Sequence, residues 1–174
     1  IDLEKLNNDS LRSGNHLKSV DTPILRQGIV DSRSIDDLLP SVQRRARALI
    51  DACRQEGITI QVTSTYRSLE RQAQLYAQGR NKPGKIVTKA KPGQSFHNWG
   101  VAFDIVPIRN GKAVWGITGE DKKLWDRIGE IGESLGLEWG GHWKTLKDFP
   151  HFQYTGGLSL AELSMGKIPA TGVV

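Results

Sequence analysis

The segment from Gly100 to Pro107 restricts the fold of this chain more than any other, because it has the clearest strand pattern in the sequence. One face of an extended strand carries Val101, Phe103 and Ile105, and the other face carries Ala102, Asp104 and Val106. An ionised carboxylate among apolar neighbours is costly unless it is paired or coordinates a metal. The segment therefore predicts a core strand in which Asp104 has a partner.

The remaining patterns predict an α+β domain, in which a small antiparallel sheet has helices packed on one side. Helical spacing and end signals occur at Pro40–Gln55, at Ser68–Gln78, from Thr118 with Asp121 as a capping box, and from Ser159 with Glu162. Further strands are predicted at 58–63, 137–139 and 151–154, and Asn110-Gly111 predicts a hairpin turn. Residues 79–94 form a long loop rich in Pro and Gly, and loops of this length are usually functional.

The net charge of +5 and the pI near 9.4 favour an anionic partner. The densest basic stretch, Arg80 to Lys91, alternates with Pro and Gly rather than with aromatic residues, so we expect no nucleic-acid partner. No apolar run approaches the roughly 20 residues that span a bilayer, so we expect no membrane insertion. The chain begins with Ile1 rather than Met, so the lack of a signal peptide in it does not argue for a cytoplasmic protein.

His97 lies seven residues before Asp104, in a Gly-rich approach to the same strand. Zinc accepts histidine nitrogen and carboxylate oxygen, and a catalytic zinc site needs three protein ligands and an open position. His151, at the start of a predicted strand, is a candidate third ligand. From the residues alone, a hydrogen-bonded structural pair of His and Asp remains the alternative to a metal site.

The whole motif from Ser95 to Asp104 resembles the S-x-H-x-x-G-x-A-x-D signature of a zinc peptidase family, and all five fixed positions match. This family holds D-alanyl-D-alanine carboxypeptidases and the L-alanyl-D-glutamate endopeptidases of phage and Bacillus. The resemblance covers roughly residues 34–169 and continues in Tyr66-Arg67-Ser68, Pro83-Gly84-Lys85-Ile86-Val87, Glu138-Trp139-Gly140-Gly141 and Asp148-Phe149-Pro150-His151-Phe152-Gln153. These last segments look most like the endopeptidase branch.

The resemblance implies that His97, Asp104 and His151 hold one Zn²⁺ per chain, in a cleft on the sheet. It implies Asp148 as the catalytic base, three residues before the last histidine, and Arg67 as the residue that stabilises the developing oxyanion. Glu138 is a rival carboxylate, but it lacks the three-residue offset to a ligand histidine.

Weaker substrate-binding candidates are Ser95, Gln72, His142 and Trp143, of which Ser95 and Gln72 have structural support as an equal alternative. His142 departs from the endopeptidase branch, which often has Asp there, and it could bind substrate, pair with Asp148 or compete for the metal. The other tryptophans are predicted to form core or cleft wall: Trp99, Trp115, Trp125 and Trp139.

The resemblance implies a zinc-dependent peptidoglycan hydrolase of endolysin type that cleaves the L-Ala-D-Glu bond of cell-wall stem peptides with a metal-activated water. One alternative is a zinc D,D-carboxypeptidase that releases terminal D-Ala, and another is a non-catalytic wall-binding module. We expect a monomer that acts on the bacterial cell wall, on the periplasmic or extracellular side, whether it arrives by phage lysis or by export. We divide the chain into an N-terminal arm packed on the domain, residues 1–33, and a zinc peptidase catalytic domain, residues 34–174.

Overall fold

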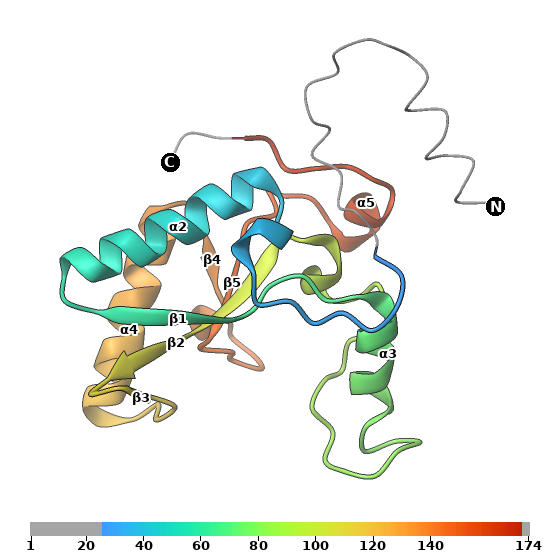
Figure 1. The fold of residues 1–174 in the computed structure, drawn as a ribbon, viewed down its shortest axis with the longest axis horizontal. Helices are drawn as coiled ribbons and strands as arrows, with labels where there is room; N and C mark the ends of the chain where they lie inside the picture. The colour runs from blue at the N-terminus through green and yellow to red at the C-terminus, as the bar shows by residue number, and fades with distance from the viewer. Residues whose placement is uncertain (1–25, 172–174) are drawn as a thin grey trace.

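The computed structural model describes residues 26–171, and its strands form one antiparallel sheet (Figure 1). The strands are β1 (Thr59–Ser64), β2 (Ala102–Arg109), β3 (Lys112–Ala113), β4 (Glu138–Trp139) and β5 (His151–Gln153). Their order across the sheet is β1-β2-β5-β4, and β3 pairs with the far end of β2. The connecting Asn110 and Gly111 have φ of 53° and 74°, as the predicted hairpin turn requires.

The pairing register gives the sheet one apolar and one polar face around β2. Phe103 pairs with Phe152 and Phe152 with Trp139, so these three rings share the face that carries the core. On the opposite face, Asp104 lies beside His151, and Gln153 lies between Ala102 and Glu138. The predicted alternation of β2 is thus confirmed, and it points Asp104 away from the main core.

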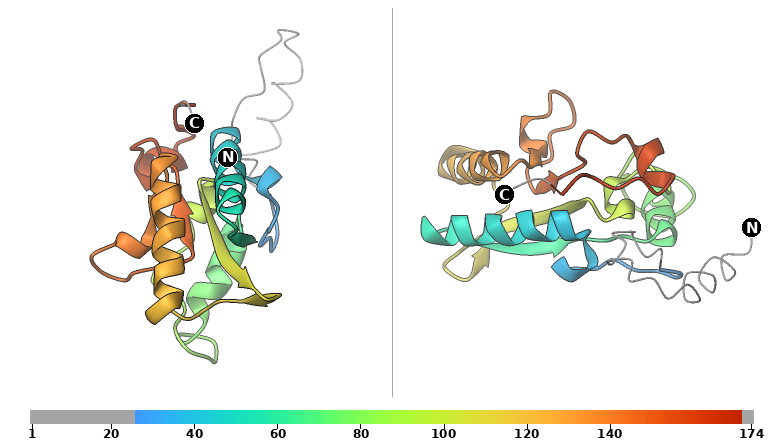
Figure 2. Two further views of the ribbon diagram at one scale, coloured as in Figure 1. Left: turned by 90° about the vertical axis from the view of Figure 1, so that its left-hand side faces the viewer. Right: turned by 90° about the horizontal axis from the view of Figure 1, so that it is seen from above.

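Helices α2 (Pro40–Gln55) and α4 (Gly119–Ser134) pack on the sheet and on each other, with steeply crossed axes (Figure 2). Leu49 and Cys53 of α2 are fully buried in the core. Helix α4 approaches β5 so closely that a β-carbon at Gly132 would lie 2.4 Å from Cε1 of Phe152. The predicted fold class, a small antiparallel sheet with helices packed on it, is confirmed.

The predicted capping box at the start of α4 is wrong. Thr118 is the N-cap residue, but its side chain caps no backbone N–H. Asp121, the expected partner, instead forms an ion pair with Arg109 at the end of β2. A long-range charged contact has therefore replaced the local one, whereas the capping box of Ser159 and Glu162 at α5 (Leu160–Ser164) forms as predicted.

Three of the four tryptophans assigned to core or cleft wall are buried, namely Trp99, Trp125 and Trp139. The assignment of Trp115 is wrong, because this side chain is 58% exposed. It follows the two-residue β3 and lines a separate surface hollow with Arg109 and Lys112.

Helix α3 (Leu69–Ala77) and the loop that follows it project from the sheet at the lower right of Figure 1. The Ser68 hydroxyl accepts a hydrogen bond from the Arg71 N–H and caps this helix, as predicted. The loop returns to η2 (Phe96–Trp99), a short 3₁₀ helix that leads directly into β2. The other 3₁₀ helices are η1 (Ile35–Asp37) and η3 (Gly140–His142).

Of the predicted N-terminal arm, residues 1–25 lie outside the described part of the chain. The last residues of the arm run beside the segment that follows β1. The Ser32 N–H donates to the Tyr66 carbonyl at 2.9 Å, and the Thr65 N–H donates to the Ser32 carbonyl at 2.7 Å. The boundary between arm and domain at residue 33 stays a prediction. Within residues 26–171, no helix combines the length and apolarity that crossing a membrane requires.

Candidate active site

Three side chains from three segments converge on the polar face of the sheet. His97 comes from η2, Asp104 from β2, and His151 from β5, where it is paired directly with Asp104. His97 Nε2 lies 3.3 Å from Asp104 Oδ1, and His151 Nδ1 lies 3.4 Å from the same oxygen. Among the described residues, this is the one group of His, Cys, Asp and Glu side chains arranged to hold a metal ion.

Hydrogen bonds leave one nitrogen of each imidazole free toward Asp104. His97 Nδ1 lies 2.8 Å from the Thr65 carbonyl oxygen, which can only accept, so Nδ1 carries the proton and Nε2 has the lone pair. His151 uses the opposite nitrogens, because its Nε2 lies 2.7 Å from Gln153 Oε1 and its Nδ1 faces Asp104. Both free nitrogens are therefore oriented as metal ligands.

The spacing of the three ligand atoms is compatible with a zinc ion. Bonds of about 2.0–2.1 Å place neighbouring ligands of a tetrahedron about 3.3 Å apart, close to the 3.3 and 3.4 Å that separate each histidine nitrogen from Asp104 Oδ1, and all three atoms lie within 4.8 Å of one another. Asp104 Oδ1 is buried and accepts no hydrogen bond, so a cation would satisfy it. Burial would raise the pKa of Asp104, but without a metal the imidazoles of His97 and His151, when protonated, outweigh burial and hold that pKa well below its ordinary value.

Asp148 lies at the edge of this group, with Oδ2 4.0 Å from His151 Nδ1. Its loop is held against η3, because the Asp148 N–H donates to the Gly140 carbonyl at 3.0 Å. A β-carbon at Gly140 would lie 2.4 Å from the Asp148 carbonyl oxygen, so only glycine permits this approach. Burial, and then the charge of Asp104, raise the pKa of Asp148 above its ordinary value, as suits a proton acceptor.

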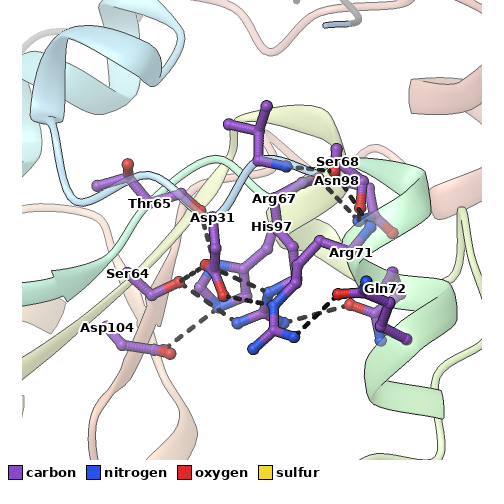
Figure 3. A network of polar contacts seen from close by, with 12 residues as sticks. Asp31, Ser64, Thr65, Arg67, Ser68, Arg71, Gln72, His97, Asn98 and Asp104 are labelled. Carbon is purple, nitrogen blue, oxygen red and sulfur yellow. Dashed lines mark hydrogen bonds and ion pairs between the residues drawn. The ribbon is translucent and has the colours of Figure 1, made fainter. Parts of the chain in front are cut away.

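Arg67 lies between β1 and α3, where three side chains hold its guanidinium (Figure 3). Its Nη2 donates to Ser64 Oγ at 3.3 Å, its Nη1 donates to Gln72 Oε1 at 3.2 Å, and its Nε lies 3.6 Å from Asp31 Oδ1. Asp31 also pairs with Nε of Arg71 at 3.2 Å. Sequence analysis missed Asp31, because nothing in the polar N-terminal segment indicates which residue it meets.

A cleft of about 790 Å³ connects the predicted site residues. Its lining includes the three candidate ligands and Arg67, Ser95, Trp143 and Asp148. Its far wall comes from the loop after α3, through Ile86, Val87 and Lys89. The Trp143 ring lies 5.0 Å from the His151 ring. The predicted cleft on the sheet is thus present.

Two of the weaker candidates lie outside the cleft lining. Gln72 is fully buried, and its Nε2 donates to the Ala90 carbonyl at 2.8 Å, so it joins Arg67 to the long loop. His142 forms a hydrogen bond with Glu133, and its ring lies 4.7 Å from the Trp139 ring. It is not within ion-pairing distance of Asp148 and is not among the clustered ligands. A substrate-binding role for either residue stays a prediction.

Comparison with known proteins places this site in a family. The peptidoglycan L-alanyl-D-glutamate endopeptidase CwlK of Bacillus subtilis is 41% identical over 122 residues, which cover 67% of this chain and 73% of that protein. The chain belongs to the M15 peptidase family. The M15 profile described as D-alanyl-D-alanine carboxypeptidase matches residues 88–154, which include all three candidate ligands and Asp148.

Other M15 relatives agree with this assignment. The L-alanyl-D-glutamate peptidase of Listeria phage A118 is 29% identical over 121 residues, which cover 70% of this chain but only 39% of the phage protein. The crystal structure of the L-Ala D-Glu endopeptidase ChiX of Serratia marcescens is similar at a TM-score of 0.52 and 28% identity, covering 71% of this chain and 87% of ChiX. The D,D-pentapeptidase VanY, solved with Zn(II), shares the fold at a TM-score of 0.52 and 17% identity, covering 83% of this chain and 86% of VanY.

Proposed function

We propose that this chain is a zinc-dependent peptidoglycan hydrolase that cleaves the bond between L-Ala and D-Glu in cell-wall stem peptides. The observation that carries the proposal is the convergence of His97, Asp104 and His151 beside Asp148 and Arg67, in a chain 41% identical to an L-alanyl-D-glutamate endopeptidase. The proposed place of action is the bacterial cell wall. The positive net charge of +5 favours approach to that anionic polymer.

In this proposal His97, Asp104 and His151 hold one zinc ion per chain. When bound, zinc supplies Lewis-acid polarisation of the scissile carbonyl and lowers the pKa of a water molecule toward about 7. Each histidine would bind zinc through the nitrogen that faces Asp104, because its other nitrogen is committed to a hydrogen bond. The carboxylate of Asp104 would bind ionised, because the metal cation would supply the positive charge that protonated imidazoles supply in its absence.

Asp148 transfers the proton in both halves of the reaction. Its Oδ2 accepts the proton of the water that attacks the L-Ala carbonyl carbon, and burial, which raises the pKa of Asp148, favours this role as a base. As the carbon–nitrogen bond breaks, the same oxygen delivers the proton to the departing amine of D-Glu. Its side chain is 47% exposed, so substrate and water can reach it in the cleft.

Arg67 stabilises the negative charge that develops on the carbonyl oxygen. Its side chain lines the cleft and is only 15% exposed, so its charge acts with less solvent screening than that of a surface arginine. Its contacts with Ser64, Gln72 and Asp31 orient the guanidinium before substrate arrives. Trp143 and Ser95 line the same cleft as the ligands and are the proposed substrate contacts.

The test is digestion of purified peptidoglycan by zinc-loaded protein, chelated protein and Asp148→Asn. The control variant is Asp126→Asn, which neutralises an α4 carboxylate that pairs with Lys122 away from the cleft. We expect new D-Glu amino termini, identified by fragment mass, that disappear with chelation and with Asp148→Asn but persist with Asp126→Asn. Release of free D-Ala would instead identify a D,D-carboxypeptidase. Binding to the wall without a zinc-dependent product would leave a non-catalytic wall-binding module.

A further inference from the structure

A chain of hydrogen bonds leads from the candidate metal ligand His151 to a carboxylate outside the ligand group. Gln153 Oε1 lies 2.7 Å from His151 Nε2, and Gln153 Nε2 donates to Glu138 Oε2. We call Glu138 and Gln153 the His151 relay. Neither residue has a role in the proposed reaction. From the sequence, Glu138 was only an alternative to Asp148 as the catalytic base.

The sheet builds the relay by register. Gln153 pairs with Glu138 across β4 and β5, and side chains directly opposite each other in a sheet share a face. His151 lies two residues before Gln153 and is therefore on that same face. Gln153 is 4% exposed and His151 is 6% exposed, so water has little access to the bond between them.

The direction of the relay follows from the chemistry of its end group. A carboxylate can only accept hydrogen bonds, so Glu138 draws the NH₂ group of Gln153 toward itself. The amide oxygen of Gln153 must then face His151, where it accepts a bond from the protonated Nε2. The lone pair of His151 is consequently on Nδ1, 3.4 Å from Asp104 Oδ1.

We propose that the His151 relay is a positioning device that keeps the proton of His151 on Nε2 and so presents Nδ1 to the metal. This inference rests on the zinc site of the proposed function. Without Glu138, nothing prevents the Gln153 amide from turning over, because its NH₂ group can donate to His151 Nε2 equally well. That arrangement places the proton on Nδ1 and competes with metal binding.

The test compares zinc affinity, by competition with a chromophoric chelator, among the wild-type protein, Gln153→Ala, Glu138→Ala and Glu138→Gln. Glu120→Ala is the matched control, since this exposed α4 carboxylate pairs only with Lys123 among the described residues. We expect Gln153→Ala and Glu138→Ala to bind zinc on the order of tenfold more weakly, as is typical when a partner of a ligand is removed. Glu138→Gln should recover only part of this loss, because its amide oxygen can still accept the Gln153 bond, but its NH₂ group can also donate to a turned-over Gln153 amide.

A spectroscopic signature separates positioning from mere structural support. In ¹⁵N-labelled zinc-loaded protein, His151 should show metal coordination through Nδ1 and a slowly exchanging proton on Nε2. In Gln153→Ala that proton should exchange rapidly, while the melting temperature of each metal-free variant reports any loss of folding.

Two results would overturn the relay: zinc affinity of Glu138→Ala within twofold of wild type, or zinc affinity of Gln153→Ala within twofold of wild type. Zinc coordination through Nε2 of His151, instead of Nδ1, in the wild-type protein would also overturn it. These readouts are independent of the cleavage assay. A protein that binds zinc with the expected pattern but releases no D-Glu amino termini would refute the proposed function and leave the relay in place.

Discussion

Substitution of Asp31 tests whether the segment before η1 positions the Arg67 guanidinium for its role in the proposed reaction. Asp31 Oδ1 lies 3.6 Å from Arg67 Nε, and this nitrogen is buried and makes no hydrogen bond. In Asp31→Ala the guanidinium keeps only its bonds to Ser64 and Gln72, so it can turn away from the carbonyl oxygen. We expect activity to fall.

The magnitude follows from the burial of the pair. Exposed ion pairs contribute about 0–1 kcal/mol, but the Arg67 side chain is 15% exposed and that of Asp31 34% exposed, so we assign this pair about 1–2 kcal/mol. At 1.36 kcal/mol per factor of ten, Asp31→Ala should lower kcat/KM about 5–30-fold. Because Arg67 acts on charge that develops in the transition state, most of the loss should be in kcat.

The assay is release of L-Ala from a synthetic L-Ala-D-Glu stem peptide. Arg71→Ala is the matched control, because it removes the other ion pair of Asp31 while leaving Arg67 in contact with Asp31. Asp31→Asn, which keeps the size and an acceptor oxygen, should lose less activity than Asp31→Ala. Unchanged or increased kcat in Asp31→Ala, or an equal loss in Arg71→Ala, would refute the positioning argument.

Four further predictions concern the site and the core. Asp148→Asn should lower kcat by about 10²–10⁴ while zinc affinity in the chelator competition is retained, and a parallel loss of zinc would make Asp148 a ligand instead. Zinc at about 1,000 times its Kd should raise Tm by about 10 °C over the chelated protein, and Asp104→Ala should abolish this shift in calorimetry. Gly132→Ala should destabilise the fold by about 2 kcal/mol in urea denaturation, because the new β-carbon meets the Phe152 ring at 2.4 Å; equal stability would show that the ring moves freely. Burial raises the pKa of the Cys53 thiol to about 11 from 9.0, so stability that is fully present below pH 9 should decline by about 3 kcal/mol as the pH rises through 11, and Cys53→Ala should lack this loss.

Local patterns in the sequence were sufficient to predict the main elements. Alternation identified β2, helical spacing identified α2, and Ser68 marked the start of α3. These signals survive folding because they depend on neighbours within a few residues. The motif from Ser95 to Asp104 pointed to the same chemistry, and its resemblance to a zinc peptidase family agrees with the M15 relatives.

Contacts between distant segments could not be read in this way. Thr118 and Asp121 had the spacing of a capping box, but Arg109 took the carboxylate of Asp121 after β2 brought it near. His142 stood among site motifs, yet it turned toward Glu133 on α4. Competition from residues far along the chain decides such pairs, and no local rule contains that information.

The sequence by itself determined which groups are available for catalysis and that Asp104 lies on a strand needing a charged partner. Only the tertiary structure decided how those groups are oriented. The register of β5 on β2 sets His151 beside Asp104, the register of β4 on β5 sets Glu138 beside Gln153, and the arm brings Asp31 to Arg67. The physical reason is that the register of each strand is the one that buries the apolar face of the whole sheet beneath α4. Because this face packs closely, the register of one strand depends on all the others.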